Sequence, residues 1–291
     1  MAHDHTHNHQ GSKNILLAFF LNASFSIIEL IGGYLTNSMA IYSDALHDFG
    51  DSLALLFAYF AEKLSHKKED RKFTFGYRRF STLAALINGL ILLAGSTYVI
   101  YESIIRIQNP EPVKAEGMIA LAILGIAVNG FAAYRLSKEK GANPKMVMYH
   151  LLEDLLGWVS VFIVSLILLF WPWYILDSIL SILISLVILR GVYKNILKVG
   201  MIFMQNFPTE LDVKQLKDEI VKFEHVKDIH EVKGWSIDGD SHYLRFHVLV
   251  SRDSNIVQLD LLKKTIKLKL KEYNIKYSTI EFESECANYD E

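Results

Sequence analysis

Two runs inside the longest apolar stretches of this chain contain acids and histidines. The first is SDALHDFGDS (residues 43–52) and the second is MYHLLEDLLG (residues 148–157). Each contains an HxxxD pair, namely His47 with Asp51 and His150 with Asp154. A spacing of four residues places both members of a pair on one face of a helix. Two such helices can offer two imidazoles and two carboxylates to one ion, a donor set that suits Zn²⁺.

Further acids on the same helical face leave the ligand set open. In the first run, Asp44 and Asp48 lie on the face that carries His47. Oxygen donors alone favour Mn²⁺ and imidazole favours Zn²⁺, so the two histidines indicate zinc. A small rotation of the helix would let Asp48 replace His47. Asp44 and Asp48 are therefore alternative or auxiliary ligands, and Mn²⁺, Fe²⁺, Co²⁺ and Cd²⁺ remain alternative metals.

These acids have no basic partners nearby, because no Lys or Arg lies in the middle of any apolar stretch. An ionisable group within a membrane span is costly and marks a functional site. The acids therefore indicate a pathway for metal or protons. The run HLLED lacks the second histidine of HExxH, and no nucleophile motif is present, so we predict that the chain is not an enzyme.

Six apolar stretches are close to or above the about 20 residues that a membrane-spanning helix needs. They are residues 15–36, 39–61, 80–101, 117–135, 146–171 and 173–190. Runs such as VSVFIVSLILLFW (residues 159–171) are apolar on every side, unlike the helices of a soluble core. We predict an all-α bundle of six transmembrane helices over residues 14–203. A His-rich tail at residues 1–13 precedes it and is expected to capture metal weakly.

Basic residues gather in the links on one side of the predicted bundle. The link between the second and third stretches contains Lys63, Lys67, Lys68, Arg71, Lys72, Arg78 and Arg79. The link at residues 37–38, on the other side, is uncharged. Since cytoplasmic loops are enriched in Lys and Arg, we expect both termini of this multi-pass membrane protein to be cytoplasmic.

The last part of the chain has a different composition. Residues 209–291 contain 13 Lys and Arg and 17 Asp and Glu, whereas the whole chain contains 30 and 32. Turn signals and alternating stretches predict the order αββαβ, a small α+β domain with an antiparallel sheet. His230 and His247 fall on adjacent predicted strands and Glu283 on the last one, so a second zinc site is predicted there. His242 is expected on the surface.

Charge and cysteine content exclude two further classes. The net charge of −2 gives no global basic field, so nucleic acid is not expected as a partner. The chain has one cysteine, Cys286, and no intrachain disulfide can form.

With these features the chain resembles the cation diffusion facilitator family of divalent-metal/proton antiporters, in its zinc-transporter branch. The resemblance implies a homodimer in the cell (inner) membrane that exports Zn²⁺ in exchange for protons by alternating access. It implies that His47, Asp51, His150 and Asp154 bind the transported ion. The C-terminal domain would be a metallochaperone-like dimerisation module in which zinc is a regulatory ligand. A metal sensor without transport is the alternative from another class.

Overall fold

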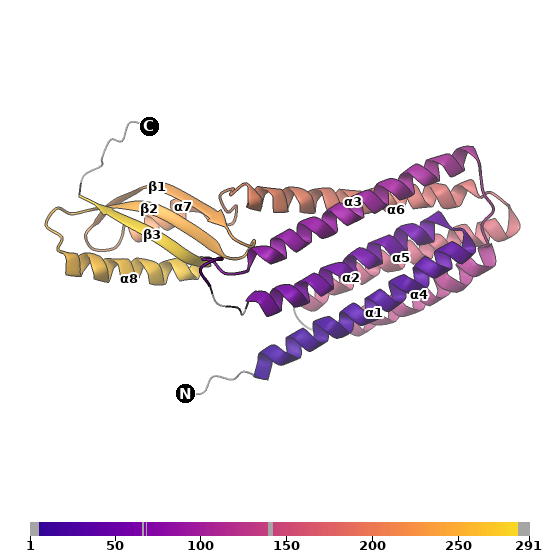
Figure 1. Cartoon of the computed structure of the whole chain (residues 1–291), viewed down its shortest axis with the longest axis horizontal. Helices are drawn as coiled ribbons and strands as arrows, with labels where there is room; N and C mark the ends of the chain where they lie inside the picture. The colour runs from indigo at the N-terminus through magenta and orange to yellow at the C-terminus, as the bar shows by residue number, and fades with distance from the viewer. Residues whose placement is uncertain (1–5, 66, 68, 139–141, 285–291) are drawn as a thin grey trace. The chain divides into compact units, whose positions relative to one another are not determined.

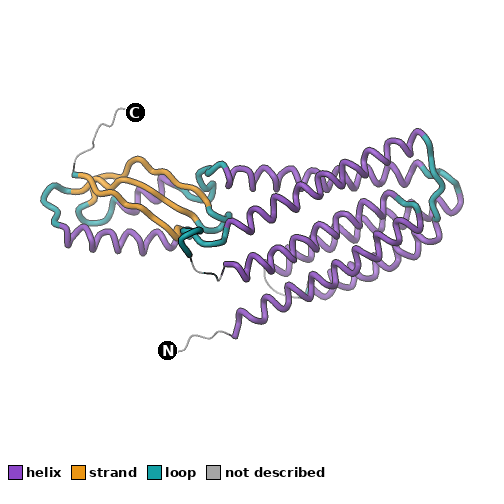
Figure 2. Tube along the Cα trace, in the orientation of Figure 1, coloured by secondary structure: helices purple, strands orange, loops and turns teal. Residues whose placement is uncertain are grey.

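The computed structural model describes residues 6–65, 67, 69–138 and 142–284 (Figure 1). The described residues form two compact units. The first unit lies within residues 1–66 and 84–196, and the second within residues 67–83 and 197–291. Helices make up the first unit, whereas the second contains the strands (Figure 2).

Six long helices cover the region predicted to span the membrane. They are α1 (Thr6–Thr36), α2 (Met39–Ser65), α3 (Arg79–Gln108), α4 (Ala115–Leu136), α5 (Ala142–Phe170) and α6 (Ile175–Phe203). The backbone of α1 begins at Thr6, within the predicted tail, and residues 1–5 of that tail lie outside the described residues. All six predicted helices are therefore present.

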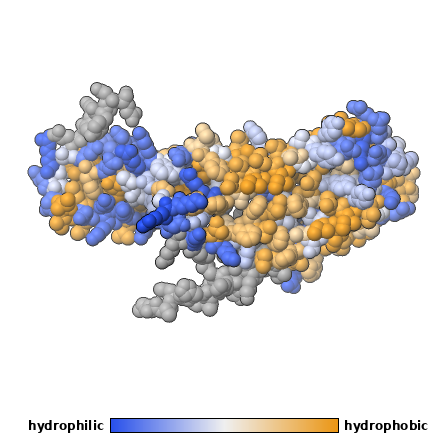
Figure 3. Space-filling view, in the orientation of Figure 1, coloured by the Kyte–Doolittle hydropathy of each residue, from blue (hydrophilic) through white to orange (hydrophobic). Residues whose placement is uncertain are grey.

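Five of these helices, among the residues described, are long and apolar enough to cross a membrane. Apolar residues accordingly cover much of their outer surface on the face seen in Figure 3. The exception is α2, whose mean composition is less apolar because Asp44, Asp48 and Asp51 lie within it. The helix that departs from the membrane pattern is the one with the most acids.

Close packing in the first unit depends on small residues. Ile41 of α2, Met118 of α4 and Trp158 of α5 belong to one buried cluster. A Cβ atom at Gly125 of α4 would lie 2.2 Å from the Trp158 ring, so only glycine permits this approach. On the other side of the unit, α3 and α6 meet through Ser103 and Ser181, whose hydroxyl oxygens are 3.0 Å apart.

The second unit contains the predicted αββαβ order. Its elements are α7 (Val213–Ile220), β1 (Val226–Ser236), β2 (His242–Val250), α8 (Ile256–Glu272) and β3 (Ile275–Glu283). The sheet order is β1-β2-β3, with β1 antiparallel to β2 and β2 parallel to β3. The prediction of an antiparallel sheet is therefore wrong for β3. A parallel pair needs a crossover, and α8 provides it.

Two local features of this unit differ from the sequence expectation. Pro208 and Thr209 predict a helix N-cap at Thr209, but the side chain of Asp212 caps α7 by accepting the amide hydrogens of Lys214 and Gln215, so the helix begins later. His242 is 5% exposed, and the prediction of a surface position is wrong. It is the first residue of β2, beside a register shift, where alternation no longer reports which side chains are buried.

The segment between α2 and α3 packs on the sheet of the second unit. The Arg78 guanidinium lies 3.3 Å from the Asp238 carboxylate and donates to the Ser241 hydroxyl at 2.6 Å. Phe75 contacts the rings of Tyr243 and Tyr277 edge-on, with centroids 5.8 and 5.5 Å away. This basic segment, residues 67–83, is therefore part of the second unit rather than a free link.

Candidate metal centres

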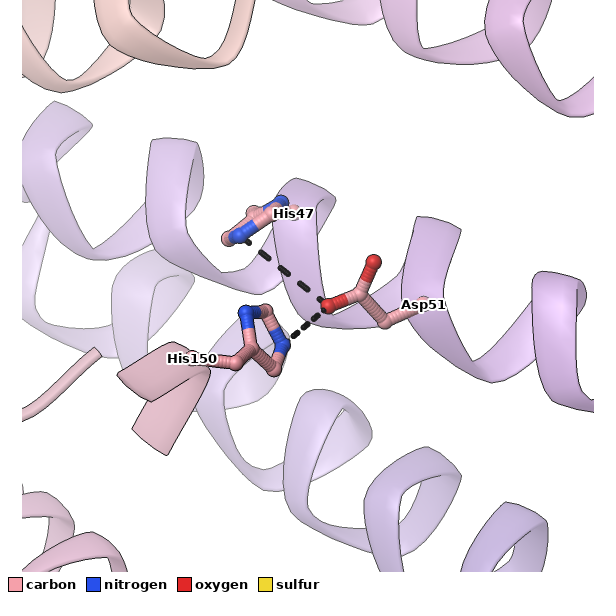
Figure 4. Close-up of side chains that lie close together, drawn as sticks. All are labelled: His47, Asp51 and His150. Carbon is pink, nitrogen blue, oxygen red and sulfur yellow. Dashed lines mark ion pairs between the residues drawn. The ribbon is translucent and has the colours of Figure 1, made fainter. Parts of the chain in front are cut away.

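The first candidate site combines side chains from α2 and α5 (Figure 4). The Nε2 atom of His150 lies 2.8 Å from the Oδ2 atom of Asp51, and Nε2 of His47 lies 4.0 Å from the same oxygen. The two imidazole rings are 5.7 Å apart and nearly perpendicular. One ligand atom from each of His47, Asp51 and His150 falls within 4.8 Å of the others. These three predicted ligands therefore come together.

The fourth predicted ligand borders this group. Oδ2 of Asp154 lies 3.8 Å from Nε2 of His150, one helical turn away on α5. Both line a cavity of about 630 Å³ together with Asp44 and Glu153. Among its described lining residues, the cavity has four acids, two histidines and no Lys or Arg. The electrostatic potential of such a cavity favours a cation.

The two alternative ligands differ in position. Asp44 lines the cavity with the predicted tetrad, whereas Asp48 is not among the lining residues described. The backbone carbonyl of Asp48 accepts the Asn22 amide at 3.0 Å, which joins α2 to α1. Asn22 thus connects helices, as an interhelical polar residue does.

Glu29 of α1 is 1% exposed, and both its carboxylate oxygens lack a hydrogen-bond partner among the described residues.

A residue far along the chain fixes the beginning of α2. The fully buried Asp177 of α6 accepts the Met39 amide hydrogen at 2.7 Å and the Ser38 hydroxyl at 2.5 Å. The bond from Met39 satisfies a backbone donor that the first turn of α2 leaves free, and the bond from Ser38 holds the residue before the helix. The sequence left open whether Asp177 lines the cavity or forms an interhelical hydrogen bond, and the structure shows the hydrogen bonds. Its partners could not be predicted, since a cap supplied by another helix leaves no local signal.

The second candidate site lies on the sheet of the second unit. His230 of β1 and His247 of β2 are directly paired, and their rings are 5.4 Å apart. Glu283 of β3 contacts both, with its oxygens 3.2 Å from Nε2 of His230 and 2.6 Å from Nδ1 of His247. One ligand atom from each of these three residues lies within 4.8 Å of the others. The three residues predicted for this site are therefore neighbours.

Charged groups surround the second cluster. Burial alone would raise the pKa of Glu283, but the hydrogen bond and charge of His247 and the nearby His230 hold it below its ordinary value. Carboxylate oxygens of Glu281 and Glu231 lie 3.5 and 3.7 Å from Nε2 of His247. Sequence reasoning missed Glu231, because a register shift after His230 and a φ of 49° bring it to this face.

Comparison with known proteins finds two domain families that together cover most of the chain. The cation efflux transmembrane domain family matches residues 15–204, and the cytoplasmic domain of cation efflux proteins matches residues 208–285. A cadmium, cobalt and zinc/H(+)-K(+) antiporter of Bacillus velezensis is 33% identical over 293 residues, covering 98% of this chain and 94% of the relative.

Two further relatives have similar coverage. The zinc transporter ZitB of Escherichia coli is 32% identical over 294 residues, covering 97% of this chain and 93% of the relative. The metal cation efflux system protein CzcD of Cupriavidus metallidurans is 30% identical over 295 residues, covering 100% and 93%. The sequence resemblance is confirmed: this multi-pass membrane protein belongs to the cation efflux, or cation diffusion facilitator, family of transporters.

Proposed function

We propose that this protein exports Zn²⁺ from the cytoplasm in exchange for protons. The observation that carries the proposal is the convergence of His47, Asp51 and His150 from two helices at one point. With Asp154 beside them, they offer two nitrogen and two oxygen donors in a cavity without a basic residue in its described lining. That donor set matches the coordination chemistry of Zn²⁺.

Cadmium and cobalt are the second candidate substrates. The Bacillus relative is named for cadmium and cobalt as well as zinc. The same two imidazoles suit all three ions, whereas Mn²⁺ prefers oxygen donors alone. We therefore expect Zn²⁺, Cd²⁺ and Co²⁺ to compete, with Mn²⁺ a weaker competitor.

Proton exchange follows from the chemistry of the donors. A histidine or a carboxylate binds metal only in its deprotonated form, so protons and metal compete for the tetrad. Alternating access would expose the tetrad first to the cytoplasm and then to the far side, where protonation releases the ion. The name of the Bacillus relative also includes H⁺ as an exchanged ion. With both termini cytoplasmic, the direction is outward across the cell (inner) membrane.

For the second unit we propose a homodimerising role with zinc as a regulatory ligand. His230, His247 and Glu283 would hold this ion, with Glu283 bridging the two histidines. A domain of about 80 residues buries limited surface, so metal binding to the folded form would add to its stability. Its 17 acids outnumber its 13 bases, and bound zinc would offset repulsion between two copies.

Flux through purified protein in sealed liposomes tests the proposal. Zinc should enter the liposomes only when the lumen is more acidic than the outside solution, and the lumen should lose protons in return. Cd²⁺, Co²⁺ and Mn²⁺ are offered in parallel. Binding of zinc without any movement across the membrane would contradict export and identify a sensor.

A further inference from the structure

A second cavity, separate from both metal clusters, lies in the second unit at the segment between α2 and α3. Its volume is about 390 Å³. The lining residues are Lys72, Phe73, Thr74, Phe75, Gly76, Arg79, Phe80, Gln205, Trp235 and Ile237. Two of these residues are cations, four are aromatic and none is acidic. The cavity therefore has positive edges and apolar walls.

Hydrogen bonds hold the segment that carries these cations in one shape. The Asp70 carboxylate accepts the amide hydrogens of Lys72 and Phe73, at 2.9 and 2.7 Å, and also the Tyr77 hydroxyl. Gly76 has a φ of 74°, which a side chain would disfavour, and its amide bonds the Phe73 carbonyl at 3.0 Å. The backbone that carries Lys72 is thus held in shape by bonds within the segment.

The two cations at the cavity have no acidic partner among the described residues. Arg78 is bound to Asp238, whereas the neighbouring Arg79 forms no ion pair with any carboxylate among the described residues. The Lys72 ammonium lies 5.7 Å from the centre of the Phe73 ring, and no carboxylate within the described part is in ion-pair contact with it. Both side chains are exposed, so they are available to an anion that enters the cavity.

Two lining residues of the cavity lie at or next to the ends of helices that are long enough to cross a membrane. Arg79 is the first residue of α3, whose 30 residues would extend about 45 Å, compared with a hydrocarbon core of about 30 Å. Gln205 follows the last residue of α6, Phe203, by two positions. The ends of such helices reach the level of lipid headgroups, where Trp, the residue type of Trp235, is enriched.

From these observations we propose that the cavity binds the phosphate headgroup of an anionic phospholipid. Lys72 and Arg79 contact the phosphate, and the aromatic walls accept the glycerol and the first part of an acyl chain. A free phosphate ester has the same charge, but it has no apolar part to occupy the walls formed by Phe73, Phe80 and Trp235. The proposal does not depend on which metal is transported.

Native mass spectrometry of the delipidated full-length protein in neutral detergent tests this proposal. Titration with phosphatidylglycerol should give one tightly held lipid per chain, whereas phosphatidylcholine should bind weakly. One Lys or Arg near an anionic lipid contributes about fivefold to affinity, so Lys72→Gln and Arg79→Gln should each weaken binding by about that factor. Arg79→Lys should retain most of it. Thermal unfolding of each variant without lipid checks that it is folded.

Arg71→Gln is the matched control, because Arg71 is an exposed cation of the same segment that does not line the cavity. Its affinity for phosphatidylglycerol should equal that of the unmodified protein. Equal losses in Arg71→Gln and Arg79→Gln would overturn the site and indicate diffuse attraction to a basic segment. Glycerol 3-phosphate should not displace the lipid at equal concentration; displacement would overturn the lipid and assign the cavity to soluble phosphate esters.

Discussion

The two histidine clusters use the same donor types in different surroundings. In the membrane unit, the side chains of His47, Asp51 and His150 are 28%, 30% and 42% exposed, and they border a cavity of about 630 Å³. In the second unit, His247 and Glu283 are 6% and 17% exposed and are hydrogen-bonded at 2.6 Å, whereas His230 is 27% exposed. The first cluster is open, whereas the second is closed around two of its three residues.

The difference in access follows from the elements that carry the ligands. Facing helices supply the membrane cluster, and they can separate or rotate as whole bodies. Neighbouring strands supply the second cluster, and backbone hydrogen bonds fix their spacing. An ion that must enter and leave needs the first kind of site, and an ion that stabilises a fold is better held by the second. On the proposed function, we therefore expect the same donors to favour passage in the first unit and retention in the second.

The largest effect is expected from breaking the open cluster. Asp51→Asn keeps the shape of the side chain but removes the charge that both histidines approach. Even outer-shell partners of a metal are worth about 10–100-fold, so zinc flux in liposomes should fall by more than that. Glu153→Gln is the control, because Glu153 lines the same cavity outside the cluster. A wild-type rate in Asp51→Asn would remove Asp51 from the ligand set.

A change of donor type in the open cluster should alter selectivity more than rate. In His47→Asp, three oxygens and one nitrogen would face the ion, and the preference for Zn²⁺ over Mn²⁺ should fall by roughly tenfold, about 1.4 kcal/mol. Competition between the two ions during flux measures this change. If the competition curves of His47→Asp and wild type coincide, Asp44 or Asp48 takes the place of His47.

The closed cluster should respond through stability. Isolated residues 209–291 have a core of their own and are expected to dimerise. Zinc at 100 times its Kd should add about 2.7 kcal/mol, which raises Tm by roughly 10 °C or more for a domain of this size. His230→Ala with His247→Ala should abolish the increase, whereas the control His225→Ala should retain it. A Tm that zinc leaves unchanged would make these histidines structural.

The smallest effect concerns pH. It tests whether the segment at residues 67–83, which contains Asp70, responds to pH independently of the closed cluster. Hydrogen bonds from Tyr77 and the Phe73 amide hold the pKa of Asp70 below its ordinary value. The ionised Asp70 carboxylate is the hydrogen-bonded form. Its contribution to the stability of the folded segment is therefore complete above the ordinary pKa, and it is lost only as pH falls through the lowered pKa of the folded state. Asp70 therefore stays ionised between about pH 5 and 8, where histidine titrates.

Amide hydrogen exchange measures this contribution. After correction for intrinsic rates, protection of Lys72 and Phe73 should be constant across that range and roughly twofold to fivefold lower in Asp70→Asn. Tyr243→Phe, which leaves the Asp70 bonds in place, is the control. A change of protection near pH 6 in the wild-type protein would mean that the histidines also affect this segment.

Periodicity made much of the fold and of both clusters predictable. The HxxxD spacing puts two ligands on one helical face whatever surrounds the helix, and six apolar stretches leave few arrangements other than a bundle. In the second unit, the Asn255 capping box defines the start of α8 locally, and the apolar run around His247 indicates a strand, although Phe246, His247 and Val248 are all buried. These signals lie within a few residues of each position that they determine.

Features that depend on distant partners could not be predicted in this way. Parallel pairing of β3 follows from the path of α8, and Glu231 reaches its histidine through an irregular register. The packing of Phe75 on strand residues far along the chain leaves no periodic trace. Asp177 likewise acts on a helix more than a hundred residues earlier, and an acid in an apolar stretch does not reveal which distant backbone it binds.

The contact between Asp177 and the start of α2 also constrains the order in which the protein can be completed during synthesis. Each Asp at the centre of a span costs about 2.5–3.5 kcal/mol on membrane insertion, and α2 contains three. Its neighbour α1 is made first and offers Asn22 to its backbone. The Asp177 carboxylate, however, emerges 138 residues after Met39. Helix α2 must therefore remain in the bilayer with its first turn incompletely hydrogen-bonded until α6 has been synthesised.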